Sequence, residues 1–123
     1  MMDERNIASG SVIPSEGYCD QPYVAKLPDG TWLCVMTTGQ GCEGQHGQHI
    51  VSCRSTDFGR TWSALTAIEP ANGPEASWAM PFVTPGGRVY VFYTYNADNL
   101  REAASGEGAG ACTTRASACR SKR

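Results

Sequence analysis

At 123 residues with a formal net charge of −2, the chain has room for one small domain and carries no excess of basic residues. This balance argues against nucleic-acid or anionic-membrane partners, and no apolar run reaches the roughly 20 residues that a membrane-spanning helix needs. The polar start of the chain lacks the apolar core of a signal peptide, so the expected location is the cytoplasm.

The first part of the chain predicts four short β-strands. These are expected at residues 23–27, 32–38, 49–54 and 65–69, with a Pro-Asp-Gly turn at 28–30 after the first. The second strand is apolar at successive positions, which predicts burial on both of its faces. A glycine-rich polar loop over 39–48 leads into the third strand.

The same pattern then starts again. Residues 78–83 resemble the first strand, a Pro-Gly-Gly turn follows at 85–87, and residues 89–95 repeat the apolar second strand. Matching the Pro-Tyr-Val at 22–24 to the Pro-Phe-Val at 81–83 gives a period of 59 residues (81 − 22). A four-stranded meander that recurs at such a spacing is typical of a β-propeller blade.

The composition changes after Leu100 to alanine, glycine, serine and arginine. Such a stretch buries too little apolar surface to offset its ordering entropy, so no strand is expected in it. The predicted organisation is an N-terminal segment (1–15), a partial propeller of one blade and two strands of the next (16–100), and a disordered or aberrant tail (101–123). Frame-shift, truncation and a natural tail all remain open as origins.

Residues 55–62 read Ser-Thr-Asp-Phe-Gly-Arg-Thr-Trp and fit the pattern S-x-D-x-G-x-T-W at every fixed position. This resembles the Asp-box, or BNR repeat, of the sialidase (neuraminidase) superfamily. Asp57 is expected to accept hydrogen bonds from the turn backbone, and Gly59 to supply a positive φ. With Ser55, Thr61 and Trp62, these residues are interpreted as structural rather than catalytic.

The resemblance covers roughly residues 16–99. It implies an all-β fold built from four-stranded antiparallel meanders, here an incomplete part of a six-bladed sialidase-like β-propeller. The family's usual reaction is hydrolysis of a terminal sialic acid, which requires no metal, so no cofactor is expected.

Candidate site residues gather at one end of the predicted meander. There the first and third strands begin and the second ends, whereas Asp29 and the Asp-box belong to the opposite end. Glu43 lies in the loop where the resemblance places the acid/base aspartate, and Asp20 is the second candidate catalytic carboxylate. The candidate substrate-binding residues are Tyr18, Gln21, His46, His49, Glu75, Trp78 and Asn96.

One departure from the family bears on the substrate. Sialidases begin this blade with Arg-Ile-Pro, whose arginine binds the substrate carboxylate, and the corresponding stretch here is Asp-Gln-Pro at 20–22. An acid at that position would repel sialic acid, which favours a neutral or differently decorated sugar.

Two further patterns have alternative interpretations. Glu43, His46 and His49 could bind Zn²⁺, but their glycine-rich loop and non-helical spacing favour polar loop residues and substrate contacts. The six cysteines include no CxxC, and Cys34 and Cys53 lie in apolar strands, which favours reduced, buried thiols over a disulfide framework.

Three functional hypotheses follow. The first is a piece of a sialidase-like glycoside hydrolase acting on a terminal sugar; the second is a non-catalytic carbohydrate-binding or scaffold propeller. The third concerns this chain itself, as a non-functional truncated product that self-associates through uncovered blade faces. The expected partner in the first two is a carbohydrate or glycoconjugate.

Overall fold

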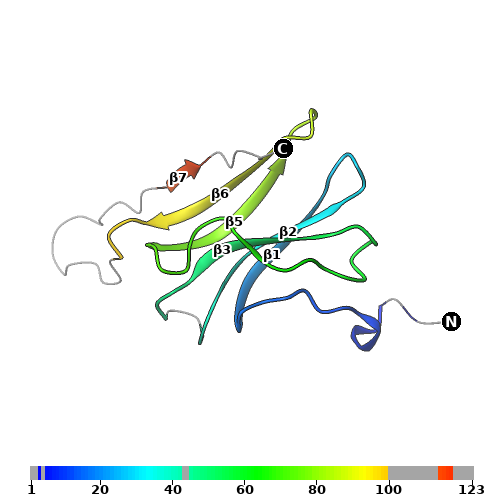
Figure 1. Cartoon of the computed structure of the whole chain (residues 1–123), viewed down its shortest axis with the longest axis horizontal. Helices are drawn as coiled ribbons and strands as arrows, with labels where there is room; N and C mark the ends of the chain where they lie inside the picture. The colour runs from blue at the N-terminus through cyan, green and yellow to red at the C-terminus, as the bar shows by residue number, and fades with distance from the viewer. Residues whose placement is uncertain (1–2, 4, 43–44, 100–113, 118–123) are drawn as a thin grey trace.

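A computed structural model describes residues 3, 5–42, 45–99 and 114–117, and they form two antiparallel β-sheets (Figure 1). A single 3-10 turn, η1 (Ile7–Ser9), precedes the sheets. Sheet one has the order β1-β2-β3-β4 and sheet two the order β5-β6-β7. The strands are β1 (Tyr18–Lys26), β2 (Trp32–Gly39), β3 (His49–Ser55), β4 (Thr66–Ala67), β5 (Glu75–Val83), β6 (Val89–Asn96) and β7 (Thr114–Ser117).

The all-β prediction is confirmed, with four corrections to the strands, the first being that β5 begins at Glu75, three residues earlier than predicted (78 − 75). β1 begins five residues earlier than predicted (23 − 18), and β4 has only two residues because Leu65 packs on the core and does not pair with β3. The prediction of no strand after Leu100 is wrong, since the backbone of β7 pairs antiparallel with β6. Within the described residues no helix is long and apolar enough to cross a membrane.

The two sheets repeat each other with an offset of 57 residues, not 59. A register shift interrupts β1 at Gln21 and β5 at Trp78, and both residues have positive φ, 46° and 58° (78 − 21 = 57). The turns after these strands obey the same offset: Pro28 corresponds to Pro85. The period of 59 came from matching Pro22 to Pro81, whereas the β-bulge sets the register.

The main core lies between the two sheets. Leu33, Val35 and Ile50 of sheet one pack there against Ala76, Ala79, Val91 and Tyr93 of sheet two. The other face of sheet one buries Cys34, Met36, Val51 and Cys53 beneath Ile13, Trp62 and Leu65. The prediction that the second strand is buried on both faces is therefore confirmed for β2. Sheet two covers one of those faces, and the 62–65 segment and Ile13 of the N-terminal segment contribute to covering the other.

The outer face of sheet two is apolar but open within the described part of the chain. Met80, Phe82 and Phe92 lie there about half-exposed. The counterpart of Phe92 in sheet one is Val35 (92 − 35 = 57), which is completely buried by sheet two, whereas Tyr23, the counterpart of Met80 (80 − 23 = 57), is 40% exposed.

Candidate functional site

The Asp-box turn after β3 has the hydrogen bonds that its motif predicts. Asp57 accepts from the Thr61 amide at 2.9 Å and from the Thr61 hydroxyl at 2.6 Å. Ser55 donates its hydroxyl to Asp57 at 2.8 Å and accepts from the Gly59 amide at 2.8 Å. These bonds, the Thr61 hydroxyl first, lower the pKa of Asp57 to about 2. The carboxylate is thus fully engaged in the turn.

Packing completes the turn. Phe58 and Gly59 adopt φ of 60° and 80°, and a Cβ on Gly59 would lie only 3.0 Å from the Trp32 ring. The Phe58 ring meets Trp32 edge-on, with the centroids 6.3 Å apart. Trp62 turns back onto the outer face of sheet one. These contacts explain why the motif demands glycine and tryptophan.

The entry end is the end where β1, β3 and β5 begin and β2 and β6 end. Cross-strand partners share a face, so Tyr18 (opposite Gly39) and Asp20 (opposite Thr37) lie together. Cys19 lies on the other face, where its thiol contacts Met36. Tyr18 and Asp20 therefore lie on the face that sheet two covers, and Asp20 is half-buried there.

The bulges bring two predicted sugar-binding residues to equivalent places. Gln21 and Trp78 both leave their strands in a left-handed conformation that costs on the order of 1–3 kcal/mol for a non-glycine residue. Their side chains are exposed, Trp78 by 56%. The Trp78 amide donates to the Thr37 hydroxyl at 3.0 Å, which ties the bulge of β5 to β2. Bulges re-aim side chains, and here they present an amide and an indole to solvent.

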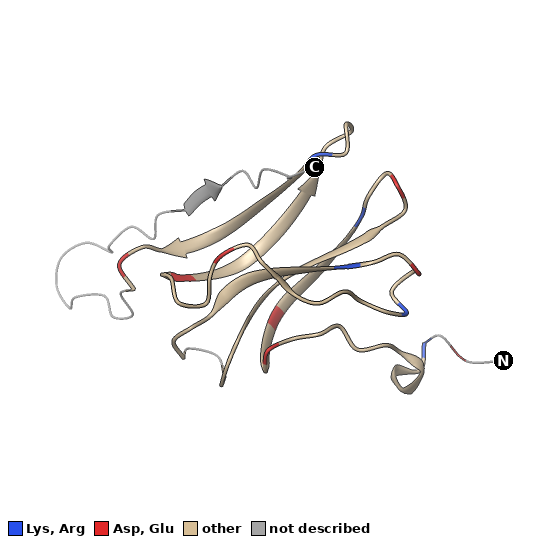
Figure 2. Cartoon of the chain, viewed as in Figure 1, with Lys and Arg blue, Asp and Glu red and all other residues tan. Residues whose placement is uncertain are grey.

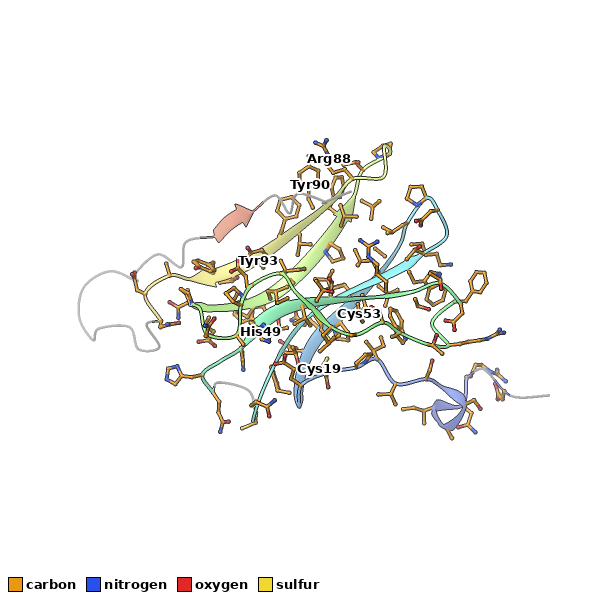
Figure 3. The ribbon with its side chains drawn as sticks, in the orientation of Figure 1. Cys19, His49, Cys53, Arg88, Tyr90 and Tyr93 are labelled. Carbon is orange, nitrogen blue, oxygen red and sulfur yellow. The ribbon has the colours of Figure 1, made fainter. Side chains whose placement is uncertain are left out.

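Both ring nitrogens of His49, which is labelled in Figure 3, are within hydrogen-bond distance of protein oxygens. Its Nδ1 lies 2.9 Å from the Glu69 carbonyl oxygen, so Nδ1 carries a proton and donates it. Its Nε2 lies 2.9 Å from a Glu16 carboxylate oxygen. Tyr93 in turn donates its hydroxyl to the Glu69 carboxylate, which links sheet two to this network. Only 3% of His49 is exposed, so its visible role is to join segments of the fold.

The remaining predicted residues separate in space. Glu43 lies outside the described residues, and His46 is exposed in the loop before β3. Glu75 and Asn96 pair with each other on the face of sheet two turned away from sheet one, because neighbouring Ala76 occupies the inter-sheet core. The predicted pocket residues thus occupy several faces of the entry end. Among the described residues, no group of three potential ligands is arranged to hold a metal ion.

Some residues that the sequence reasoning did not single out also matter at this end. Gln48 is 7% exposed, and its amide nitrogen has no hydrogen-bond partner in the described part of the chain. Glu16 and Glu69 bind His49, although they lie 33 and 20 residues from it along the chain. No pattern in the neighbouring sequence predicts pairs that are so far apart along the chain.

A cavity of about 360 Å³ lies at the opposite end, between the sheets. The turns at 28–30 and 85–87 close over it, and we call this the turn end. Charged side chains are sparse and lie mostly on turns and strand ends (Figure 2). The lining reaches Val35, which is two residues along β2 from Thr37, the partner of the Trp78 amide. The cavity is lined by Leu27, Pro28, Asp29, Leu33, Val35, Ser52, Arg54, Ile68, Gly87, Val89 and Val91.

Comparison of the chain with known protein families, with curated proteins and with solved structures gave no match.

Proposed function

We propose that the two sheets are neighbouring blades of a sialidase-like β-propeller, and that the chain is part of a glycoside hydrolase acting on a terminal sugar. The observation that carries the proposal is the pair of equivalent bulges, which present Gln21 and Trp78 at equivalent positions on two stacked sheets. Backbone strain of this kind clusters at ligand sites. The complete hydrogen-bond set of the Asp-box supports the family assignment.

The stacking of the sheets supports a propeller. The face of sheet one that carries Val35 receives sheet two, and the equivalent face of sheet two presents Phe92 to solvent within the described residues. A further sheet that lay on sheet two as sheet two lies on sheet one would cover Met80, Phe82 and Phe92. In the absence of such a blade, we propose that this face drives self-association, which sedimentation of the chain at increasing concentration measures.

The substrate proposed is a neutral sugar. Asp20 occupies the place of the family's carboxylate-binding arginine and lies half-buried beside Thr37, so a sialic acid carboxylate would meet a negative charge. Glu43 is proposed as the general acid and base, with Asp20 as the second carboxylate that glycoside hydrolysis requires. The unpaired amide nitrogen of Gln48 supplies a buried donor for an acceptor oxygen at the same end.

A non-catalytic sugar-binding propeller is the second candidate. It is favoured by His49, whose two ring nitrogens are both occupied by protein oxygens and are therefore not available for proton transfer to a substrate.

Binding and turnover tests separate these candidates. Methyl glycosides of common neutral sugars are titrated against the chain while tryptophan fluorescence is followed. Trp78→Ala is expected to weaken binding about tenfold, equivalent to about 1.4 kcal/mol. The control is Phe58→Ala, because Phe58 is an exposed aromatic residue at the opposite end. Binding that survives Trp78→Ala unchanged, or no binding to any sugar, contradicts a sugar site at the bulges.

Turnover is assayed with a panel of 4-methylumbelliferyl glycosides. Hydrolysis that is lost in Glu43→Gln and in Asp20→Asn supports the hydrolase. Sugar binding without hydrolysis of any member of the panel supports the binding module instead.

A further inference from the structure

The cavity at the turn end is partly open to solvent and is lined mainly by apolar side chains from, or next to, both sheets. Leu33, Val35 and Ile68 form the wall of sheet one, and Val89 and Val91 form the wall of sheet two. Its volume of about 360 Å³ falls in the range of small-molecule pockets, roughly 300–1,000 Å³.

The roof of the cavity is formed where the two hairpin turns meet. A Cβ placed on Gly87 would lie at van der Waals distance, 3.5 Å, from the Cγ of Pro28, so the two turns lie close to each other. Gly87 has φ of 79°, a conformation that suits glycine. The backbone conformation of the two hairpin turns thus sets the position of the roof. The cavity is a consequence of how the two sheets pack.

The polar side chains that line the cavity differ in whether the protein already binds them. The Asp29 carboxylate accepts a hydrogen bond from the Thr31 amide at 2.9 Å, and this bond lowers the pKa of Asp29, which keeps it charged. Arg54 is exposed at the edge of the cavity, and within the described part of the chain no carboxylate lies in ion-pair distance of its guanidinium. Ser52 adds a hydroxyl between Arg54 and the apolar floor. The Arg54 charge also contributes to lowering the pKa of Asp29, so a ligand carboxylate at Arg54 would compete with Asp29 for this cation.

The apolar lining of the cavity and the cation at its edge indicate the class of ligand. An apolar ligand body between the sheets would leave water and would cover the partly exposed lining side chains of Leu27, Ile68 and Val89. A sugar would have to bury hydroxyl groups against these side chains without partners, which is costly. We propose that this cavity binds a small amphipathic carboxylate, with its apolar body between the two sheets and its carboxylate at Arg54.

The test compares two probes that differ in one group, 4-phenylbutyrate and 4-phenyl-1-butanol. Both are titrated into the full-length chain by heteronuclear NMR. The backbone amides of Val35, Val89 and Val91 are expected to shift with both probes, and 4-phenylbutyrate is expected to bind more tightly.

Replacing a positive and a negative residue in turn tests whether Arg54 binds the carboxylate of the ligand. Arg54→Gln is expected to weaken 4-phenylbutyrate about two- to fivefold, the range of an exposed ion pair, and to leave the alcohol unchanged. Asp29→Asn keeps the acceptor for the Thr31 amide but removes a nearby negative charge, so it is expected to strengthen 4-phenylbutyrate binding. Arg60→Gln is the matched control, since Arg60 is an exposed arginine outside the cavity lining.

Three outcomes would overturn the proposal. The first is no shift at the valine amides at millimolar probe. The second is shifts centred on Gln21 and Trp78, which would place the probe at the sugar site. The third is an Arg54→Gln effect that is equal for the carboxylate and the alcohol, which would reduce Arg54 to a structural role.

Discussion

Replacing Ile50 tests whether the two sheets share one core. Ile50 is completely buried and packs with Leu33 and Val35 against sheet two. An isoleucine-to-alanine change at such a position costs about 2–5 kcal/mol, and we expect about 3 because both sheets must relax to fill the space. Ile50→Val removes one methylene group and is expected to cost about 1 kcal/mol. Against a total stability of about 5–15 kcal/mol, the valine variant is the safer measurement.

Urea unfolding followed by near-ultraviolet circular dichroism provides the assay. With a slope of about 1.5 kcal/mol per molar urea, a loss of about 3 kcal/mol lowers the midpoint by about 2 M. Val24→Ala is the control, because Val24 is 45% exposed on β1 and its truncation should change stability by no more than about 0.5 kcal/mol. If both Ile50 variants shift the midpoint no more than Val24→Ala does, the argument for a shared inter-sheet core is refuted.

Three further predictions concern the turn, the histidine network and the thiols. The pKa of Asp57 is lowered to about 2 from 3.8, so its contribution to stability is complete above about pH 4 and is lost as the pH falls through 2; Asp57→Asn should flatten the melting temperature between these values. Glu16→Ala should cost about 1–3 kcal/mol, measured by thermal melting, because it leaves buried His49 without its Nε2 partner; the reasoning fails if the variant melts like the parent. Burial raises the pKa of Cys34 to about 12, so iodoacetamide should alkylate exposed Cys42 in the native chain and Cys34 only after unfolding, as peptide mass spectrometry would show; equal rates would contradict the burial.

Local features of the chain were readable from the sequence. The hydrogen bonds to Asp57 in the turn at 55–62 join residues within eight positions of one another, so these bonds and the positive φ of Gly59 could be predicted from the residue types. The uninterrupted apolar run of β2 predicted its burial on both faces in the same way. Strand length was less accessible, because β4 ends where Leu65 and Ile68 pack, and packing is not a property of the local sequence.

The candidate site shows the opposite case. The sequence placed Tyr18, Asp20, Gln21 and Trp78 at the entry end of the strands. Tyr18 and Asp20 lie at the start of β1, whereas Gln21 and Trp78 are each the fourth of nine residues in β1 and β5. The sequence offered no sign that both ring nitrogens of His49 would be occupied by groups 20 and 33 residues away. A sequence motif specifies residue types and spacing. Whether a side chain is free to react depends on which groups, distant along the chain, bind it in the folded protein.

The amino-acid sequence by itself determined the β class, the main turns and the hydrogen-bonded turn at 55–62, because each depends on steric and hydrogen-bonding preferences of neighbouring residues. Only the tertiary structure decided the 57-residue register, the bond from Trp78 to Thr37 across 41 residues and the cavity between the sheets. These features depend on how two sheets stack, and stacking is settled by the volumes and register of side chains that meet only in the folded chain.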